Sequence, residues 1–312
     1  MKAQPLTALL ALTLIALPAV TAAAAVEPSY LYNLSSSTGV IPFSAVRLSY
    51  DDEHHELFVM GAGLIRIFND SGMELYAFGD DPGLGGAPIW AAPMAGGDLM
   101  LLAYDTEHRP FLARCDYRGE LIERSQLTGF PPELATGFSP NYLAVVGDKV
   151  YLASLGEMRV AVTDLQGQYR SSRDLAEAIE VADKREDFGI AGFRVDRRGN
   201  MLFTVQPLFK AFVITAQGEV RSFGIKGSAP GKFNVVSGIA SDDRGNFYVT
   251  DILKSAVLVF NDKLEFVKEF GYRGRSPGSL AAPCDVIAGN GKLFVAQNAK
   301  RGVNVYQLLY PN

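Results

Sequence analysis

Residues 231–260, GKFNVVSGIASDDRGNFYVTDILKSAVLVF, contain three short apolar runs separated by turn residues. The runs are Gly-Ile-Ala at 238–240, Phe-Tyr-Val-Thr at 247–250 and Ala-Val-Leu-Val-Phe at 256–260. The first two are separated by Arg244-Gly245-Asn246, and both Gly and Asn tolerate the positive φ angles of tight hairpin turns. Short runs of this composition bounded by turns are typical of β-strands. The stretch therefore predicts consecutive strands joined by hairpins.

The same unit recurs six times along the chain. Apolar runs equivalent to 247–250 start 42, 51, 51, 46 and 46 residues apart, at 57–60, 99–102, 150–153, 201–204, 247–250 and 293–296. Another run follows each of them, at 64–68, 111–115, 160–163, 211–214, 256–260 and 303–306. A further run, such as 74–79 or 265–271, comes next, and one more, such as 46–48, lies upstream. Four short strands in each repeat of this length predict an all-β, six-bladed β-propeller.

The sixth repeat ends after Leu308 with three strands instead of four. Its missing outer strand can come from the N-terminal run Tyr-Leu-Tyr-Asn-Leu at 30–34. A blade without that strand would have an unpaired edge, and pairing of the two chain ends closes the ring. We therefore expect residues 30–34 to pair with 303–306, and residues 26–312 to form a single domain.

Residues 231–260 resemble the NHL repeat. The resemblance rests on Gly-x-Phe at 231–233, Gly-Ile-Ala, Asp-x-x-Gly-Asn at 242–246, Tyr-Val-x-Asp at 248–251 and the terminal Val-Phe. Residues 278–306 are similar, the fourth repeat matches in part, and the first three match faintly. The usual Pro is replaced by Val236, and the usual Asn and Arg of the next loop by Lys254 and Ala256. The resemblance implies an NHL-type propeller without specifying a subfamily.

The first 25 residues have the order of a secretory signal peptide. Met1 and Lys2 precede an apolar run from Leu6 to Val20, and four alanines follow at 22–25. The apolar run is shorter than the roughly 20 residues that a membrane-spanning helix needs. We expect cleavage near Ala25, an exported protein that is periplasmic or extracellular, and no transmembrane segment in the mature chain.

Charge and cysteine content narrow the classes of partner and cofactor. The net charge of −5 argues against general nucleic-acid binding, which usually requires a basic surplus. No C-x-x-C-H motif for haem and no spaced Cys/His cluster for zinc is present. The sequence therefore predicts no cofactor. Cys115 and Cys284 fall in different repeats. A disulfide needs Cα atoms within about 7 Å. The sequence is therefore compatible with both free and paired cysteines.

Ligand sites in propellers usually lie where the innermost strands begin. In this chain those positions are expected at Ala45-Val46, Trp90-Ala91, Asn141-Tyr142, Ala191-Gly192, Ser237-Gly238 and Cys284-Asp285. This ring has one carboxylate, no His and no Lys. Zinc needs three or four donors and calcium six to eight oxygens. The ring therefore predicts neither a catalytic set nor a metal site.

Turns between the second and third strands are expected on the same face as this ring. Together they nominate seven binding residues: Trp90, His108, Arg109, Asn141, Tyr142, Arg159 and Asp285. Trp90 could stack on a ligand or fill space between blades. Glu107 beside His108 suggests acid–base chemistry, although no nucleophile partner is identifiable. His54 and His55 lie in the acidic turn 51–56, which is expected to be a solvated hairpin on the opposite face.

Residues 173–187, RDLAEAIEVADKRED, interrupt the strand pattern. Leu175, Ile179 and Ala182 have the i, i+4, i+7 spacing of an amphipathic helix. Such a helix would lengthen the connection between the third and fourth blades. It would either cover the propeller or dock a partner.

The sequence favours a non-enzymatic binding module that presents a face of loops to a protein or glycan, for example in an envelope complex. Such a protein would act as a monomer or within a hetero-complex. The alternative is a lyase or hydrolase of the NHL/lactonase-like type working at the channel mouth. That activity would require Asp285, Glu107, His108 and Arg159 to converge. A structural calcium site is a third reading, and the fold alone cannot choose among them.

Overall fold

The structure is a computed structural model that describes residues 26–36, 39–41, 46–61, 63–79, 82–135, 137–298 and 300–311. The expected signal peptide, 1–25, and Ala45 of the predicted ring lie outside these ranges. Among the described residues, no helix has the length and apolar character needed to cross a membrane.

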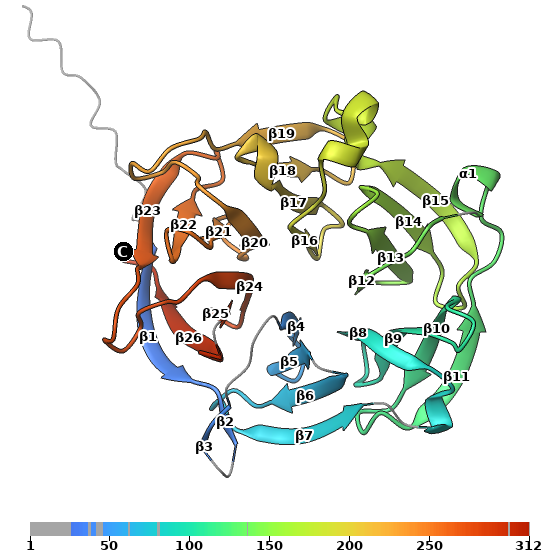
Figure 1. The fold of residues 1–312 in the computed structure, drawn as a ribbon. Helices are drawn as coiled ribbons and strands as arrows, with labels where there is room; N and C mark the ends of the chain where they lie inside the picture. The colour runs from blue at the N-terminus through green and yellow to red at the C-terminus, as the bar shows by residue number, and fades with distance from the viewer. Residues whose placement is uncertain are drawn as a thin grey trace, which may run out of the picture.

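Six four-stranded antiparallel sheets surround a central axis, as predicted (Figure 1). Blade 1 contains β4 (Arg47–Asp51), β5 (Glu56–Gly61), β6 (Leu64–Phe68) and β7 (Glu74–Gly79). Blade 2 contains β8 (Ala87–Pro93), β9 (Leu99–Tyr104), β10 (Pro110–Cys115) and β11 (Leu121–Gln126). Blade 3 contains β12 (Tyr142–Val146), β13 (Lys149–Ser154), β14 (Arg159–Thr163) and β15 (Tyr169–Asp174).

The second half of the ring repeats this pattern. Blade 4 contains β16 (Gly192–Val195), β17 (Met201–Val205), β18 (Lys210–Ile214) and β19 (Val220–Phe223). Blade 5 contains β20 (Val236–Ser241), β21 (Phe247–Asp251), β22 (Ala256–Phe260) and β23 (Phe266–Gly271). Blade 6 contains β24 (Pro283–Gly289), β25 (Lys292–Gln297), β26 (Val303–Leu309) and β1 (Glu27–Asn33). The innermost strands contact one another in the order β4, β8, β12, β16, β20, β24 and back to β4.

The predicted closure of the ring is confirmed. β1 is the outer strand of blade 6 and pairs antiparallel with β26, with Tyr30 opposite Tyr306. Beyond the strand, the Leu34 amide donates to the Val303 carbonyl over 3.0 Å. The hairpin of β2 (Ser35–Ser36) and β3 (Gly39–Val40) follows, and the Ser35 amide donates to the Gly72 carbonyl of blade 1. The N-terminal segment therefore joins blade 6 to blade 1.

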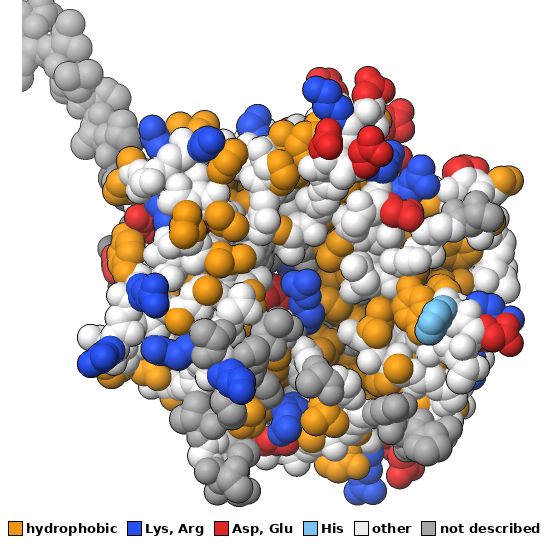
Figure 2. Space-filling view, viewed as in Figure 1, with side chains coloured by type: hydrophobic (Ala, Val, Ile, Leu, Met, Phe, Trp, Pro, Cys, Tyr) orange, Lys and Arg blue, Asp and Glu red, His pale blue; other side chains and the backbone are white. Residues whose placement is uncertain are grey.

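The two faces of the ring carry different loops. We call the face where the innermost strands begin the entry face. It carries the connections between blades and the turns between the second and third strands of each blade. We call the other face the exit face, and it carries the turns that follow the first and third strands. Figures 1 and 2 look onto the entry face.

Glycines let the innermost strands of blades 4, 5 and 6 approach closely. A Cβ atom on Gly192 would lie 2.1 Å from the Ser237 carbonyl oxygen, and one on Gly238 would lie 2.7 Å from the Asp285 Cα. Neither space admits a side chain without a backbone shift. The ring is therefore narrow on this side, which brings side chains from blades 4 and 6 within reach of each other.

The predicted continuous helix over 173–187 is wrong. Arg173 and Asp174 belong to strand β15, and α2 covers only Leu175–Ala178. The Asp174 carboxylate caps α2 by accepting from the Glu177 amide over 3.0 Å. Glu180 then adopts a φ of 61°, which ends the right-handed turn before the 3-10 segment η2 (Ala182–Asp187). The remaining short helices are η1 (Pro82–Leu84), α1 (Pro132–Ala135) and η3 (Gln206–Leu208).

Both cysteines are free. Cys115 ends β10 in blade 2 and Cys284 lies in β24 of blade 6, so they belong to separate sheets. Burial raises the pKa of each thiol to about 12. Both side chains are therefore protonated and unreactive at neutral pH.

Candidate functional site

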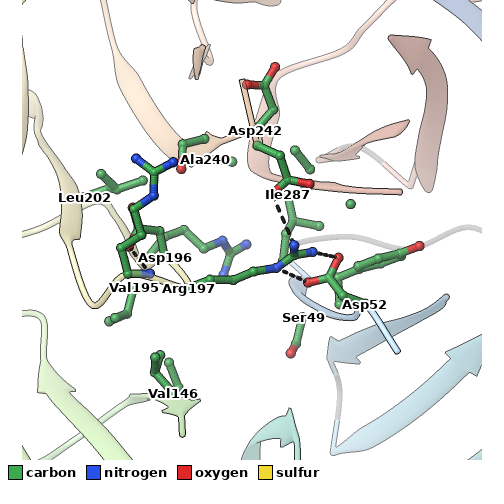
Figure 3. Close-up of a pocket in the computed structure, with 18 of the residues that line it drawn as sticks. Ser49, Asp52, Val146, Val195, Asp196, Arg197, Leu202, Ala240, Asp242 and Ile287 are labelled. Atoms are coloured by element: carbon green, nitrogen blue, oxygen red, sulfur yellow. Dashed lines mark hydrogen bonds and ion pairs between the residues drawn. The ribbon is translucent and has the colours of Figure 1, made fainter. Parts of the chain in front are cut away.

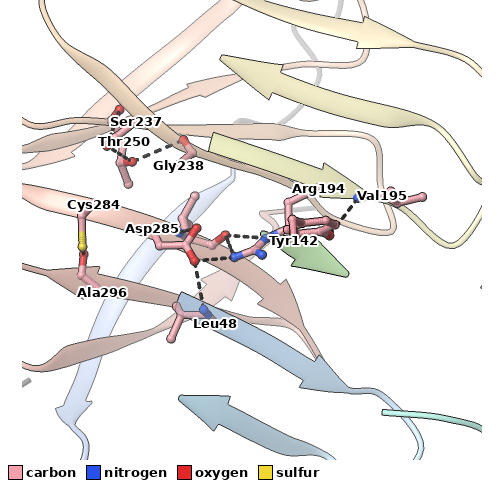
Figure 4. Close-up of polar contacts among 11 residues, drawn as sticks. Leu48, Tyr142, Arg194, Val195, Ser237, Gly238, Thr250, Cys284, Asp285 and Ala296 are labelled. Carbon is pink, nitrogen blue, oxygen red and sulfur yellow. Dashed lines mark hydrogen bonds and ion pairs between the residues drawn. The ribbon is translucent and has the colours of Figure 1, made fainter. Parts of the chain in front are cut away.

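A buried ion pair closes the centre of the ring (Figure 4). Arg194 of β16 reaches Asp285 of β24, with Nη2 2.8 Å from Oδ2. Both side chains are less than a tenth exposed. Asp285 also accepts from the amides of Leu48 and Val286, each over 2.9 Å. The pair therefore ties blades 4, 6 and 1 together across the axis, and we call it the axial plug.

Both members of the axial plug also bond to backbone groups. Arg194 donates from Nη2 to the Val286 carbonyl over 3.1 Å. Burial alone would lower the pKa of Arg194, but the adjacent Asp285 carboxylate more than offsets it and raises that pKa. The Tyr142 hydroxyl accepts from the Val195 amide at 3.3 Å, and burial raises its pKa. Because these buried groups are already hydrogen-bonded, they hold the ring together and are poorly placed to transfer protons.

Trp90 and Tyr142 pack beside the axial plug. The two ring centroids are 4.5 Å apart, and Tyr142 makes an edge contact with Phe193 at 4.8 Å. Trp90 and Tyr142 are each only 3% exposed. Trp90 therefore fills space between blades 2 and 3, which is the packing alternative of the two considered from the sequence. Their assignment as binding residues stays a prediction.

The other nominated residues are spread over separate blades. Asn141 accepts from the Leu155 amide through Oδ1 and so fixes the start of blade 3. Arg109 pairs with Asp105 and Glu107 in the β9–β10 turn, at 3.0 and 3.1 Å. Arg159 approaches Asp174, a residue that Arg185 also contacts. In the described part of the chain, no hydrogen bond or ion pair joins the exposed His108 ring to another residue.

The set required by the enzyme alternative is therefore not brought together. Asp285 is buried at the axis with Arg194, whereas Glu107 and His108 are exposed on the rim of blade 2. Arg159 has its own partner in blade 3. No group of three or more His, Cys, Asp or Glu side chains that could hold a metal ion is found among the residues described. His54 lies on the exit face, with Nδ1 2.8 Å from the Asp51 carboxylate.

A funnel opens on the exit face, opposite the predicted site (Figure 3). Its volume is about 1060 Å³, and all six innermost strands contribute to its wall. Part of the wall is aliphatic and half-buried, formed by Met94, Val145, Val146, Val195 and Ile287. Four aromatic side chains of the wall present little surface, since Trp90, Tyr142, Tyr50 and Phe247 are each at most 9% exposed. The fifth, Tyr310, is half-buried, and the Arg244 guanidinium carbon lies 3.8 Å from its ring centroid.

Arg197 crosses the mouth of the funnel. It lies in the β16–β17 turn of blade 4, and its Nε donates to Oδ2 of Asp52 in blade 1 over 2.9 Å. Its Nη1 is 3.2 Å from Oδ1 of Asp243 in blade 5. Since blades 1 and 4 face each other across a ring of six, this side chain spans the opening, as Figure 3 shows. We call Arg197, Asp52 and Asp243 the crossbar.

The crossbar is exposed enough to open. The Arg197 side chain is 58% exposed and that of Asp243 is 76% exposed. Burial raises the pKa of Asp52, and the hydrogen bond from Arg197 works in the opposite direction. Ion pairs with this exposure contribute roughly 0–1 kcal/mol each. A ligand entering the funnel could therefore displace Arg197 at small cost.

The sequence contains a signal for the crossbar within its turns. The turns Asp196-Arg197-Arg198-Gly199-Asn200 and Asp242-Asp243-Arg244-Gly245-Asn246 have the same form. In each, the first Asp accepts the amides two and four residues ahead, which leaves the second residue free to point at the axis. The turn at Asp51-Asp52 is related, with Asp51 accepting the Glu53 amide. The residues at that second position, Arg197, Asp243 and Asp52, carry opposite charges. This indicates that they pair when the blades face one another across the ring.

No protein-family model and no curated protein matches the sequence. Solved structures are similar in fold. A streptogramin B lyase matches with a TM-score of 0.53 and 13% identity, over 91% of this chain and 97% of that one. A catalytically inactive virginiamycin B lyase from Staphylococcus aureus with quinupristin gives 0.55 and 13%, over 87% and 84%. A Bacteroides thetaiotaomicron protein of unknown function gives 0.61 and 12%, over 91% and 76%. At these identities the likeness establishes the propeller fold alone.

Proposed function

We propose that this chain is an exported, non-catalytic binding propeller of the NHL-repeat type, and that its exit-face funnel holds a segment of a partner protein. The observation that carries the proposal is the funnel itself. It combines an aliphatic wall, a charged mouth that opens at small cost, and a floor sealed by the axial plug. A large concave pocket is the usual form of a binding site.

The wall favours a protein segment over a glycan. Sugar rings are commonly held by stacking on an exposed aromatic face. Four aromatic residues of this funnel are buried, and the ring of the fifth, Tyr310, is covered by the Arg244 guanidinium at 3.8 Å. Half-buried aliphatic side chains such as Val146 and Ile287 instead suit the apolar side chains of a peptide. The crossbar supplies both signs of charge, which can pair with a polar residue of the same segment.

Site-specific photocrosslinking in cells tests this proposal. A photoreactive phenylalanine analogue placed at Val146 in the funnel should form adducts with a polypeptide. The matched control places the analogue at Ile122, which is 54% exposed on the outer strand β11 and far from the axis in the sheet order. Polypeptide adducts at Val146 and none at Ile122 are expected. Equal adducts at both positions, or adducts only with glycan, would overturn the proposal.

Export is tested separately by cell fractionation. The mature protein is expected outside the cytoplasm, with an N-terminus near Val26 established by sequencing of the purified chain. Recovery of the full chain starting at Met1 from the cytoplasm would contradict this part of the proposal.

A further inference from the structure

The entry-face loops of blades 5 and 6 carry positive charge without exposed carboxylates. They are the segments 224–235, 252–255, 272–282 and 298–302, and none of them contains Asp or Glu. Their cationic residues, apart from Lys254, are Lys226, Lys232, Arg273, Arg275, Lys300 and Arg301. Within the described structure, Arg273, Arg275 and Arg301 form no ion pair. These side chains are therefore available to an anionic surface.

Apolar side chains protrude from three of the same loops. Leu253 is 69% exposed, the highest value for any large apolar side chain among the described residues. Ile225 is 61% exposed and Tyr272 is 49% exposed. Each stands on a separate loop, so they form isolated tips. We call these three residues and the cations of the four loops the basic apolar surface.

A buried hub fixes the loops relative to one another. Lys254 follows Leu253, and its Nζ lies 2.8 Å from Oε2 of Glu269 with both side chains less than a tenth exposed. Lys254 also donates to the Ala229 carbonyl over 3.0 Å. The Tyr272 hydroxyl donates to Oε1 of Glu269 over 2.8 Å. The loops that carry Ile225, Leu253 and Tyr272 are thus joined into one platform.

The charges of the entry face are segregated. The segment 174–187 between blades 3 and 4 contains six acidic residues, Asp174, Glu177, Glu180, Asp183, Glu186 and Asp187, against Lys184 and Arg185. Figure 2 shows acidic side chains gathered over this segment, and Lys and Arg side chains over blades 5 and 6 beside apolar atoms. An anionic surface would therefore attract one side of this face and repel the other.

We propose that the basic apolar surface docks this protein on an anionic phospholipid bilayer. Cations bind the negative leaflet surface, and apolar tips enter the boundary between headgroups and acyl chains. A bilayer adapts to isolated protruding side chains, whereas a protein interface usually has a contiguous, shape-complementary apolar core. In this orientation the funnel on the exit face points away from the bilayer. The proposal does not depend on what the funnel binds.

Vesicle co-sedimentation of the mature chain tests the proposal. Binding is expected to vesicles of phosphatidylcholine containing about 30% phosphatidylglycerol, and it should weaken with added salt. The double variants Arg273→Glu/Arg275→Glu and Ile225→Ser/Leu253→Ser should each lower the bound fraction at least about fivefold. Thermal unfolding of each variant establishes that it is folded.

The matched control is Tyr117→Ser/Arg118→Glu, which removes an exposed apolar side chain and reverses a charge in the β10–β11 turn on the exit face. This variant and the funnel variant Val146→Lys should bind vesicles as the unmodified chain does. Absence of vesicle binding by the unmodified chain would overturn the proposal, as would equal binding to neutral and anionic vesicles. So would equal losses in the entry-face and exit-face variants.

Discussion

Among the charged residues, burial and hydrogen bonding distinguish those that hold the fold together from those that can contact a ligand. Arg194 and Asp285 are buried and bonded to backbone groups of Leu48 and Val286. Arg197 is 58% exposed and holds two carboxylates on a solvated face. Both arginines lie in blade 4, three residues apart. Arg194 is buried and is therefore part of the scaffold. Arg197 is exposed and is therefore an adaptable part of the funnel.

Removing one partner of the axial plug should be costly. Asp285→Ala leaves the buried Arg194 guanidinium unpaired, so a loss of about 3–5 kcal/mol in the free energy of unfolding is expected. The double variant Arg194→Met/Asp285→Leu should lose less than Asp285→Ala alone, because no charge is left buried. Denaturant unfolding measures both. The control Arg170→Met breaks an exposed pair with Asp164 and should cost about 0–1 kcal/mol. A double variant that loses as much stability as Asp285→Ala, or more, would contradict this account.

Between blades 3 and 4, tertiary contacts override the helix propensity of the sequence. Residues 173–187 have the composition and spacing of a helix, yet α2 spans a single turn. Leu175 and Ala176 are fully buried against the propeller, and Arg173 stays paired with Val160 in the blade. The chain must then reach the start of β16, so it leaves the helical path at Glu180. Burial of one turn and continuity with the next blade outweigh helix propensity.

Glycine substitutions on either side of this break should have opposite effects. Glu180→Gly relieves the strain of a positive φ and should stabilise the protein by about 0.5–1 kcal/mol. Glu177→Gly, inside α2, should destabilise it by about 1 kcal/mol because glycine is a poor helix former. Thermal unfolding of the two variants measures the difference. A loss of stability in both would show that Glu180 is not strained.

At the scale of the whole molecule, the pairing of β1 with β26 makes six blades into a closed ring. Glu27 lies opposite Leu309, so the start of β1 is next to the end of β26. Tyr32 and Lys292 of blade 6 both contact Asp70 of blade 1, the first by a 2.7 Å hydrogen bond to its carbonyl. Without β1, blade 6 would expose an edge strand and lose the contact made by Tyr32. Such edges promote association between chains.

A circular permutant tests closure. A chain that runs from Val46 to Pro311, through a short linker, and then from Val26 to Ser36 would make blade 6 continuous in sequence. It should be monomeric and unfold in one cooperative transition like the unmodified protein. A truncated chain that starts at Val46 should unfold at lower temperature and self-associate. Calorimetry and size-exclusion chromatography measure both, and equal stability of the truncated chain would contradict the role given to β1.

Local and periodic features of the amino-acid sequence specify the architecture of this protein. Strand runs, turn chemistry and the three-stranded last repeat are local or periodic features, because a strand in a blade is bounded by its own hairpin turns. They predicted the number of blades and the closing partner of β26, and the structure agrees on both. Trp90, Tyr142 and Asp285, which the sequence assigns to the innermost strands, lie in β8, β12 and β24.

The position of the open site depends instead on contacts between distant parts of the chain. The sequence pointed to the entry face, but Arg194 and Asp285, 91 residues apart, meet at the axis and seal it. Arg197 and Asp52 are 145 residues apart and face each other only when the ring closes. Repeat patterns specify each blade separately, whereas contacts across the axis depend on blade number, tilt and small residues such as Gly192 and Gly238. Those quantities exist only in the assembled ring.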